Sequence, residues 1–175
     1  RHVKTDLSTT GYQAAGGGTA VTVDHDYKDT LPSFNLAANI TDEFIVRVGA
    51  AKVMTRPQLG FLSPGGSIAT TGNLSINTGN PFLKPFRAKT FDTSFEYYFK
   101  NKAFVGVGLF QKNIDTYIQS LRTNVAFRDS GLPLSLLPAN FTGEEVFALT
   151  TPVNTDGGKL KGFEINYQQP FTFLP

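Results

Sequence analysis

Apolar and polar residues alternate on either side of a short polar segment near the middle of the chain. Before this segment, one parity carries the aromatic residues Phe91, Phe95, Tyr97 and Phe99. The opposite parity is mostly polar, with Asp92, Ser94, Glu96 and Tyr98. After the segment, Val105, Val107 and Leu109 again share one parity. Because successive side chains of a β-strand point to opposite faces, the pattern predicts a hairpin with one apolar face, closed by a turn at Lys100–Lys102.

The same alternation recurs elsewhere in the chain. It is clear at 34–40, 44–53 and 163–167, and a mixed stretch at 1–12 is also compatible with a strand. Pro32 lacks a backbone N–H, so we expect an irregular point there. Together these stretches predict about six strands.

The predicted connections alternate between short and long. Turns at Thr41–Glu43 and Lys100–Lys102 are short, whereas the long connections are Ala14–Val23, Gln58–Phe86 and Arg122–Asp156, the last with a short helix expected near Gly143–Ala148. In an up-and-down sheet, such alternation gathers the short turns at one rim and the long loops at the other. The predicted fold class is therefore all-β, an antiparallel up-and-down meander laid out like part of an outer-membrane barrel.

Strand length supports a membrane barrel, although a soluble β-sandwich remains the alternative. A tilted strand of about 10 residues spans roughly 23 Å, close to the apolar band of such barrels, which is about 25 Å tall. Tyr97 and Phe99 lie at the short-turn end, where an interfacial aromatic girdle belongs. In a sandwich that binds carbohydrate, the same apolar parity would instead form a closed core.

Composition narrows the function classes. Charged residues make up 17% of the chain and the net charge is +2, which gives no indication of nucleic-acid binding. The chain has no cysteine and no apolar run long enough for a transmembrane helix. Its first residues lack the apolar core of a signal peptide. Because both ends fall within the strand pattern, we expect a piece of a longer chain.

Catalytic and metal-binding chemistry finds little support. Residues 24–26 read Asp-His-Asp, but three consecutive strand residues alternate in direction and cannot converge on one ion. With two histidines in the chain, no Ser-His-Asp arrangement can be placed. We therefore expect no enzyme activity, no metal site and no cofactor.

Several segments, taken in order, resemble the barrel of TonB-dependent outer-membrane receptors. They are 27–36 (YKDTLPSFNL), Arg47, 55–57 (TRP), 79–85 (GNPFLKP), 88–99 with its Phe91-Asp92 and Glu96–Phe99 elements, 109–115 (LFQKNID) and 162–164 (GFE). The resemblance covers nearly the whole chain, and its specificity lies in the order and spacing of the segments.

The resemblance implies the architecture and setting of the parent protein. Residues 1–175 would form part of a 22-stranded barrel in the Gram-negative bacterial outer membrane, without the plug domain and the terminal strands. The partners would be outer-membrane lipid, the TonB complex acting through the missing plug, and an imported ligand. The family includes receptors for siderophores, vitamin B12 and oligosaccharides, and the Pro- and Gly-rich motifs favour the receptors of carbohydrate scavengers.

Ligand contacts are expected in the long connections. The candidates are the aromatic, amide and basic residues Phe61, Asn73, Asn77, Arg122, Asn124, Phe127 and Asn140. Such side chains suit sugars, because they stack and form hydrogen bonds. Gly79-Asn80-Pro81 is interpreted instead as the point where the chain re-enters the next strand.

Overall fold

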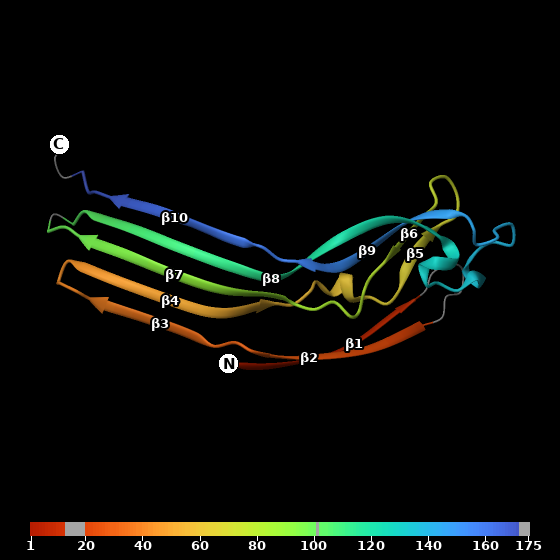
Figure 1. Cartoon of the computed structure of the whole chain (residues 1–175), viewed down its shortest axis with the longest axis horizontal. Coiled ribbons are helices and arrows are strands. Elements are labelled where there is room, and N and C mark those ends of the chain that lie inside the picture. Colours follow the sequence, from red (N-terminus) through yellow and green to blue (C-terminus); the bar gives the residue numbers. More distant parts are fainter. Residues whose placement is uncertain (13–19, 101, 172–175) are drawn as a thin grey trace.

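The protein is a long, curved sheet of antiparallel strands with a folded cap of connections at one end (Figure 1). The structure is a computed structural model that describes residues 1–12, 20–100 and 102–171. The strands are β1 (His2–Tyr12), β2 (Ala20–Thr30), β3 (Ser33–Asn39), β4 (Phe44–Thr55), β5 (Gly66–Ala69), β6 (Ser75–Thr78), β7 (Phe86–Tyr98), β8 (Phe104–Ala126), β9 (Val146–Asp156) and β10 (Lys159–Gln168). Three 3-10 helices lie in the connections: η1 (Leu59–Leu62), η2 (Phe127–Ser130) and η3 (Leu134–Leu136). Among the described residues, no helix is long and apolar enough to cross a membrane, a finding that concerns helices alone.

The order of pairing is an up-and-down meander. The main sheet runs β3-β4-β7-β8-β9-β6-β5, and β10 pairs with the part of β8 that β9 leaves free. β1 and β2 form a separate antiparallel pair. β2 continues into β3 through Leu31-Pro32, and β9 continues into β10 through Gly157-Gly158. Apart from β5 and β6, the chain forms six strand runs, β1, β2 with β3, β4, β7, β8, and β9 with β10, in agreement with the prediction of about six strands. The irregular point expected at Pro32 separates β2 from β3.

The pairing of β8 with β9 and β10 keeps one register along the whole of β8. Thr116 lies opposite Asp156 and Asn113 lies opposite Lys159, so the two glycines between β9 and β10 add no shift. At Gly157 the chain passes so close to the Ile114 carbonyl that a Cβ atom would collide with it. Glycine is needed at this point because only hydrogen fits.

Short turns gather at one end of the molecule and long connections at the other, as predicted (Figure 1). In the β3–β4 turn, the Phe44 amide donates to the Thr41 hydroxyl oxygen at 3.0 Å. The β7–β8 turn places Lys102 in the left-handed region, at φ 65°. Of the connection predicted at Ala14–Val23, residues 14–19 lie outside the described residues, whereas 20–23 were wrongly included because they form the start of β2.

The connection between β4 and β7 folds back onto the strands as an ordered layer. Its Leu62 and Leu83 pack with Ile118 of β8, and all three side chains are buried. It also contains the β5–β6 hairpin, which has no counterpart among the predicted strands, and β6 pairs in parallel with β9. A second cluster joins Ile76 of β6 to Phe127 and Phe147.

Two predictions for the region 122–156 were wrong. β8 continues to Ala126 and β9 begins at Val146, so the connection between them covers only 127–145. The helix expected near Gly143–Ala148 is absent: Gly143 has φ +90° and the residues from Val146 onward form β9. The β-branched residues of 149–155 favour a strand, and this preference outweighs Pro152.

A buried ion pair holds β2 against β7, where β2 has no partner in the main sheet. The Arg87 guanidinium donates two hydrogen bonds to the Asp29 carboxylate, at 2.7 Å and 3.1 Å. The Asp29 side chain is only 3% exposed, so the pair is largely shielded from water. This two-point contact fixes both side chains and sets the distance between the two strands.

Candidate membrane surface and ligand-binding site

One face of the sheet is an unbroken apolar surface across five strands. Register fixes it: Phe44 lies opposite Tyr97, and Val46 lies opposite Phe95, which in turn lies opposite Val107. The face is formed by Phe34, Leu36, Ala38, Phe44, Val46, Val48, Ala50, Phe91, Thr93, Phe95, Tyr97, Val105, Val107, Leu109, Phe163, Ile165 and Tyr167. We call it the apolar belt. Phe163 and Ile165 are 69% and 64% exposed, so no described residue covers this face. An exposed apolar surface of this extent indicates a lipid or protein environment.

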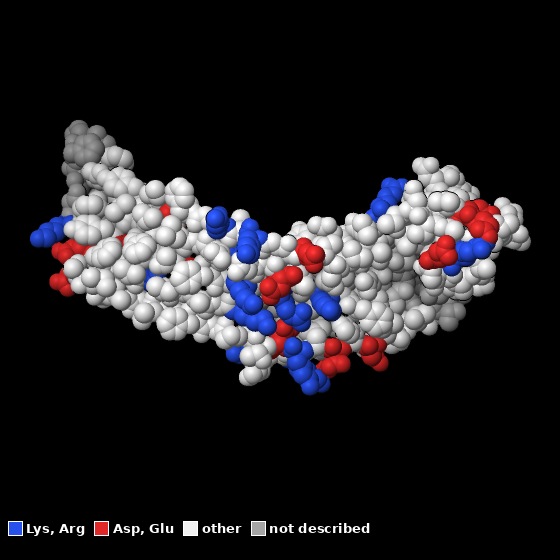
Figure 2. Space-filling model, viewed as in Figure 1, with Lys and Arg blue, Asp and Glu red and all other residues white. Residues whose placement is uncertain are grey.

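The two borders of the apolar belt are chemically distinct. At the short-turn border the rings of Tyr97 and Phe99 meet edge to face, with centroids 4.8 Å apart. At the other border Lys52 lies opposite Lys89. Phe99 and Lys89 are ten residues apart, which at about 3.3 Å per residue and a tilt of about 40° corresponds to a height of roughly 25 Å. Figure 2 shows charged side chains at the short-turn end and across the middle, with a mainly uncharged zone between them.

The opposite face of the same strands is polar and hollowed. Arg47 donates to the Glu96 carboxylate at 2.9 Å, and Ser94 and Tyr98 donate to it at 3.2 Å and 3.1 Å. A hollow of ≈ 510 Å³ lies on this side; its lining includes Asn35, Arg47, Asp92, Ser94 and Glu164. Charged groups of both signs therefore sit on the face that a barrel turns away from lipid.

Glycines on the polar face leave room for aromatic rings. Gly162 lies directly opposite Phe110, and a Cβ atom on Gly162 would come within 2.7 Å of the end of the Phe110 ring. Phe110 in turn lies beneath the Lys112 ammonium, 5.8 Å from the ring centroid. The small residues on this parity therefore let the rings lie flat along the sheet, which keeps the hollow open.

A second hollow, of ≈ 460 Å³, lies among the outer connections and joins two of the predicted ligand residues. Phe61 of η1 and Asn77 of β6 line it together with Ser67, Ser120 and Thr150. The remaining lining residues are glycines, Ser63, Thr78 and Pro152, so no charged side chain borders it. We call it the outer hollow. Its surface offers hydroxyl, amide and backbone groups with one aromatic ring, a combination suited to a neutral, hydroxyl-rich ligand.

Close backbone approaches and one asparagine shape the outer hollow. A Cβ atom on Gly66 would collide with the Asn77 carbonyl oxygen, and one on Gly79 with the Ser63 carbonyl oxygen. Asn80 donates from its side chain to the Pro152 carbonyl at 3.2 Å and from its backbone to the Phe61 carbonyl at 2.6 Å. The chain then enters β7 at Phe86, so the predicted re-entry role of residues 79–81 agrees with the structure.

The other predicted ligand residues lie apart from the outer hollow. Asn73 and Asn140 are exposed in the connections. Arg122 and Asn124 were expected in a loop, but they are exposed on β8. Phe127 has no exposed surface, because it packs against Ile76 and Phe147. In this arrangement Phe127 supports the connections and has no surface to offer to a ligand.

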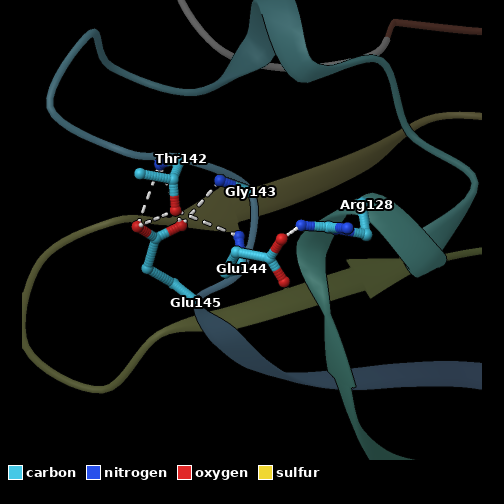
Figure 3. A network of polar contacts seen from close by, with 5 residues as sticks. All are labelled: Arg128, Thr142, Gly143, Glu144 and Glu145. Carbon is cyan, nitrogen blue, oxygen red and sulfur yellow. Dashed lines mark hydrogen bonds and ion pairs between the residues drawn. The ribbon is translucent and has the colours of Figure 1, made fainter.

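A polar network holds the tip of the connection between β8 and β9 (Figure 3). The Glu145 carboxylate accepts hydrogen bonds from the Thr142 and Gly143 amides, at 2.9 Å and 2.8 Å. Glu144 forms an ion pair with Arg128 of η2. The hydrogen bond from the Thr142 backbone lowers the pKa of Glu145 below the usual carboxyl range, because it stabilises the charged form.

No metal centre is found in the described part of the chain. There, no group of three or more His, Asp or Glu side chains is placed to hold an ion. His25 points to the covered side of β2, where its ring lies 5.8 Å from the Phe82 ring, and the flanking Asp24 and Asp26 are exposed. The arrangement at 24–26 is thus the alternating one that the sequence predicted.

A family model described as TonB dependent receptor-like, beta-barrel, matches residues 1–174. The chain belongs to this family. The barrels of TonB-dependent receptors are outer-membrane proteins of Gram-negative bacteria, and members of the family are transporters and not enzymes. The resemblance found in the sequence is therefore confirmed. No curated protein sequence matches the chain.

Solved structures of TonB-dependent receptors share the fold of this barrel segment. The siderophore receptor PirA from Acinetobacter baumannii is 17% identical, with a TM-score of 0.58 over 87% of this chain and 23% of its own. A mutant of the ferric enterobactin receptor PfeA from Pseudomonas aeruginosa is 18% identical, with a TM-score of 0.61 over 87% of this chain and 22% of its own. A double mutant of the Serratia marcescens hemophore receptor HasR, in complex with its hemophore and heme, is 18% identical, with a TM-score of 0.60 over 95% of this chain and 27% of its own. The chain thus spans about a quarter of the length of these receptors.

Proposed function

We propose that this chain forms part of the barrel of a TonB-dependent active transporter, which binds a scarce ligand outside the cell and imports it. In the complete protein the barrel has 22 strands and encloses a plug domain that contacts TonB. The apolar belt carries this proposal: it is exposed, unbroken across five strands and about 25 Å tall, the height of the apolar band of such barrels. The hollowed polar face would then contact the plug.

The chemistry of the outer hollow favours an oligosaccharide as the imported ligand. An uncharged lining of Ser, Thr, Asn and Gly with one aromatic ring provides hydrogen bonds and stacking, and no charge that would select an anion. Siderophores and heme are ligands of the similar solved receptors. For this chain they are the competing ligand classes.

The rival function is a soluble β-sandwich that binds carbohydrate. A sandwich buries its apolar face beneath a second sheet. The described residues include no such sheet over the apolar belt, and Leu36, Leu109 and Phe163 are all about half exposed or more. The exposed belt therefore favours the transporter.

Spin labelling of the full-length protein tests the membrane assignment. Single cysteines are placed at Phe95, on the apolar belt, and at Ser94, on the polar face. Access of oxygen but not of a water-soluble quencher to position 95 supports contact with lipid. Protection of position 95 from both reagents, with position 94 open to the quencher, would show a closed core and support the sandwich.

Binding measurements test the ligand class. Calorimetry of the full-length receptor compares neutral oligosaccharides with ferric siderophores, and Asn77→Ala is paired with Asn73→Ala as its control. We expect loss of a hydrogen-bonding amide in the outer hollow to weaken oligosaccharide binding roughly fivefold to tenfold. Equal effects of both substitutions, or binding of siderophores alone, would contradict the assignment to this hollow.

A further inference from the structure

A row of lysines follows the border of the apolar belt on the side of the long connections. Lys52 of β4 lies opposite Lys89 of β7, Lys89 lies opposite Asn113 of β8, and Asn113 lies opposite Lys159 of β10. Since residues directly opposite each other in a sheet share a face, all four project from the face of the apolar belt. We call Lys52, Lys89 and Lys159 the lysine row. Lys161 lies on the same face, one step closer to the belt.

The charges of the lysine row are not neutralised within the described part of the chain. None of the three ammonium groups takes part in an ion pair within 4.0 Å there. Asp29 carries a charge near Lys52, but it already forms two hydrogen bonds with Arg87. Like charges directly opposite each other destabilise a sheet. An anion that contacts Lys52 and Lys89 together would remove this repulsion.

The position of the lysine row relative to the apolar belt selects the kind of anion. Its level is about 25 Å from Phe99 at the opposite border, which is one thickness of the apolar band. The lysine row therefore coincides with the headgroups of a membrane that surrounds the belt. Lysine stems can lie along apolar surface while the ammonium group reaches the headgroup layer. Lys89 and Lys159 are exposed and available for such contacts.

We propose that the lysine row is a binding site for the phosphate groups of anionic lipids, in the leaflet next to the long connections. Phosphates of neighbouring headgroups would bridge Lys52, Lys89 and Lys159 and hold this border of the barrel at the headgroup level. The site is distinct from the outer hollow and serves no step of ligand import. The inference rests on the proposed function, because it requires the apolar belt to be in a membrane.

Local lipid selectivity tests this site in the full-length receptor. A fluorophore on a single cysteine at Gln111, on the belt face beside the row, is quenched by brominated phosphatidylglycerol or brominated phosphatidylcholine in mixed vesicles. The ratio of the two quenching curves gives the preference for the anionic lipid. The test variant is Lys52→Gln with Lys89→Gln. The control is Lys4→Gln with Lys28→Gln, another pair of directly opposed lysines, which lies on β1 and β2 beyond the belt.

We expect the unmodified receptor to prefer phosphatidylglycerol, and the test variant to lose this preference by roughly tenfold or more, since each lysine near an anionic surface contributes about a fivefold change. The control variant should keep it. Three results would overturn the lipid site while leaving the membrane assignment intact. They are quenching without a preference for either lipid, an equal loss of the preference in both variants, and suppression of the preference by dilute inorganic phosphate alone. If neither brominated lipid quenches, the apolar belt is not in lipid and the proposed function itself fails.

Discussion

Replacing Phe95 by arginine should be among the most damaging single changes on the apolar belt, because this residue lies near its middle. Phe95 is four residues from Phe99 and six from Lys89, so its depth is roughly 10 Å from one border and 15 Å from the other. Arginine at the middle of a bilayer costs about 2–4 kcal/mol on the lipid face of a barrel. Since Phe95 is 39% exposed, the lost packing is modest and the burial of charge dominates. We expect a loss of about 3 kcal/mol, or roughly a hundredfold in the unfolding equilibrium.

The matched control is Ser94→Arg, one residue away on the polar face. An arginine at position 94 lies opposite Arg47, a like charge. Two carboxylates offset the repulsion: Glu96, which accepts a hydrogen bond from Ser94, and Asp92, which lines the same hollow as Ser94. We expect a cost within about 1 kcal/mol for this change. The assay is denaturant-induced unfolding of the full-length receptor from lipid vesicles. Equal losses for the two variants would refute the assignment of the belt to lipid, as would a harmless arginine at position 95.

Three further outcomes follow from the fold. Gly157→Ala should destabilise the barrel by about 1–3 kcal/mol because its Cβ meets a carbonyl oxygen, whereas Gly158→Ala, with open space around it, should be nearly neutral in the same unfolding assay. Asp29→Asn should cost about 2 kcal/mol, since it leaves the partly buried Arg87 without its anion, and hydrogen exchange at the start of β7 should rise; unchanged exchange there would contradict a role in strand placement. Because folding lowers the pKa of Glu145, its contribution to stability is present above the unfolded value near 4.5 and is lost as pH falls through the lower folded value. Amide exchange in its loop should therefore accelerate only in acid. In Glu145→Gln this dependence on pH should disappear.

The half of the sheet nearest the short turns could be predicted from sequence, because there one face meets an apolar medium and the other does not. That asymmetry produces the strict alternation around Phe95 and Phe163. In the outer half the connections pack against the strands, so Ile118 and Phe147 are both buried and the period-two signal fades. The prolines of 133–152 then suggested a loop where β8 and β9 continue.

The candidate sites depend on contacts that no local pattern encodes. Phe61 and Asn77 were both predicted, but only the close backbone approaches at Gly66 and Gly79 bring them to one hollow. The lysine row depends on register, since a shift of one residue would turn Lys89 to the other face. Sequence identified these residue types, and the pairing of the strands determined which of them act together.

The length of β8 also decides where an incoming ligand is first met. Ser120, on the outer hollow, is seven residues beyond Asn113 in the lysine row, which places the hollow roughly 18 Å above the headgroup level. At physiological ionic strength an electrostatic potential decays over about 8 Å, so little of the membrane's surface charge is felt at that height. The extended strand thus acts as a spacer that keeps ligand capture in bulk solution. The membrane's surface charge would then have little influence on how often a charged ligand reaches the hollow.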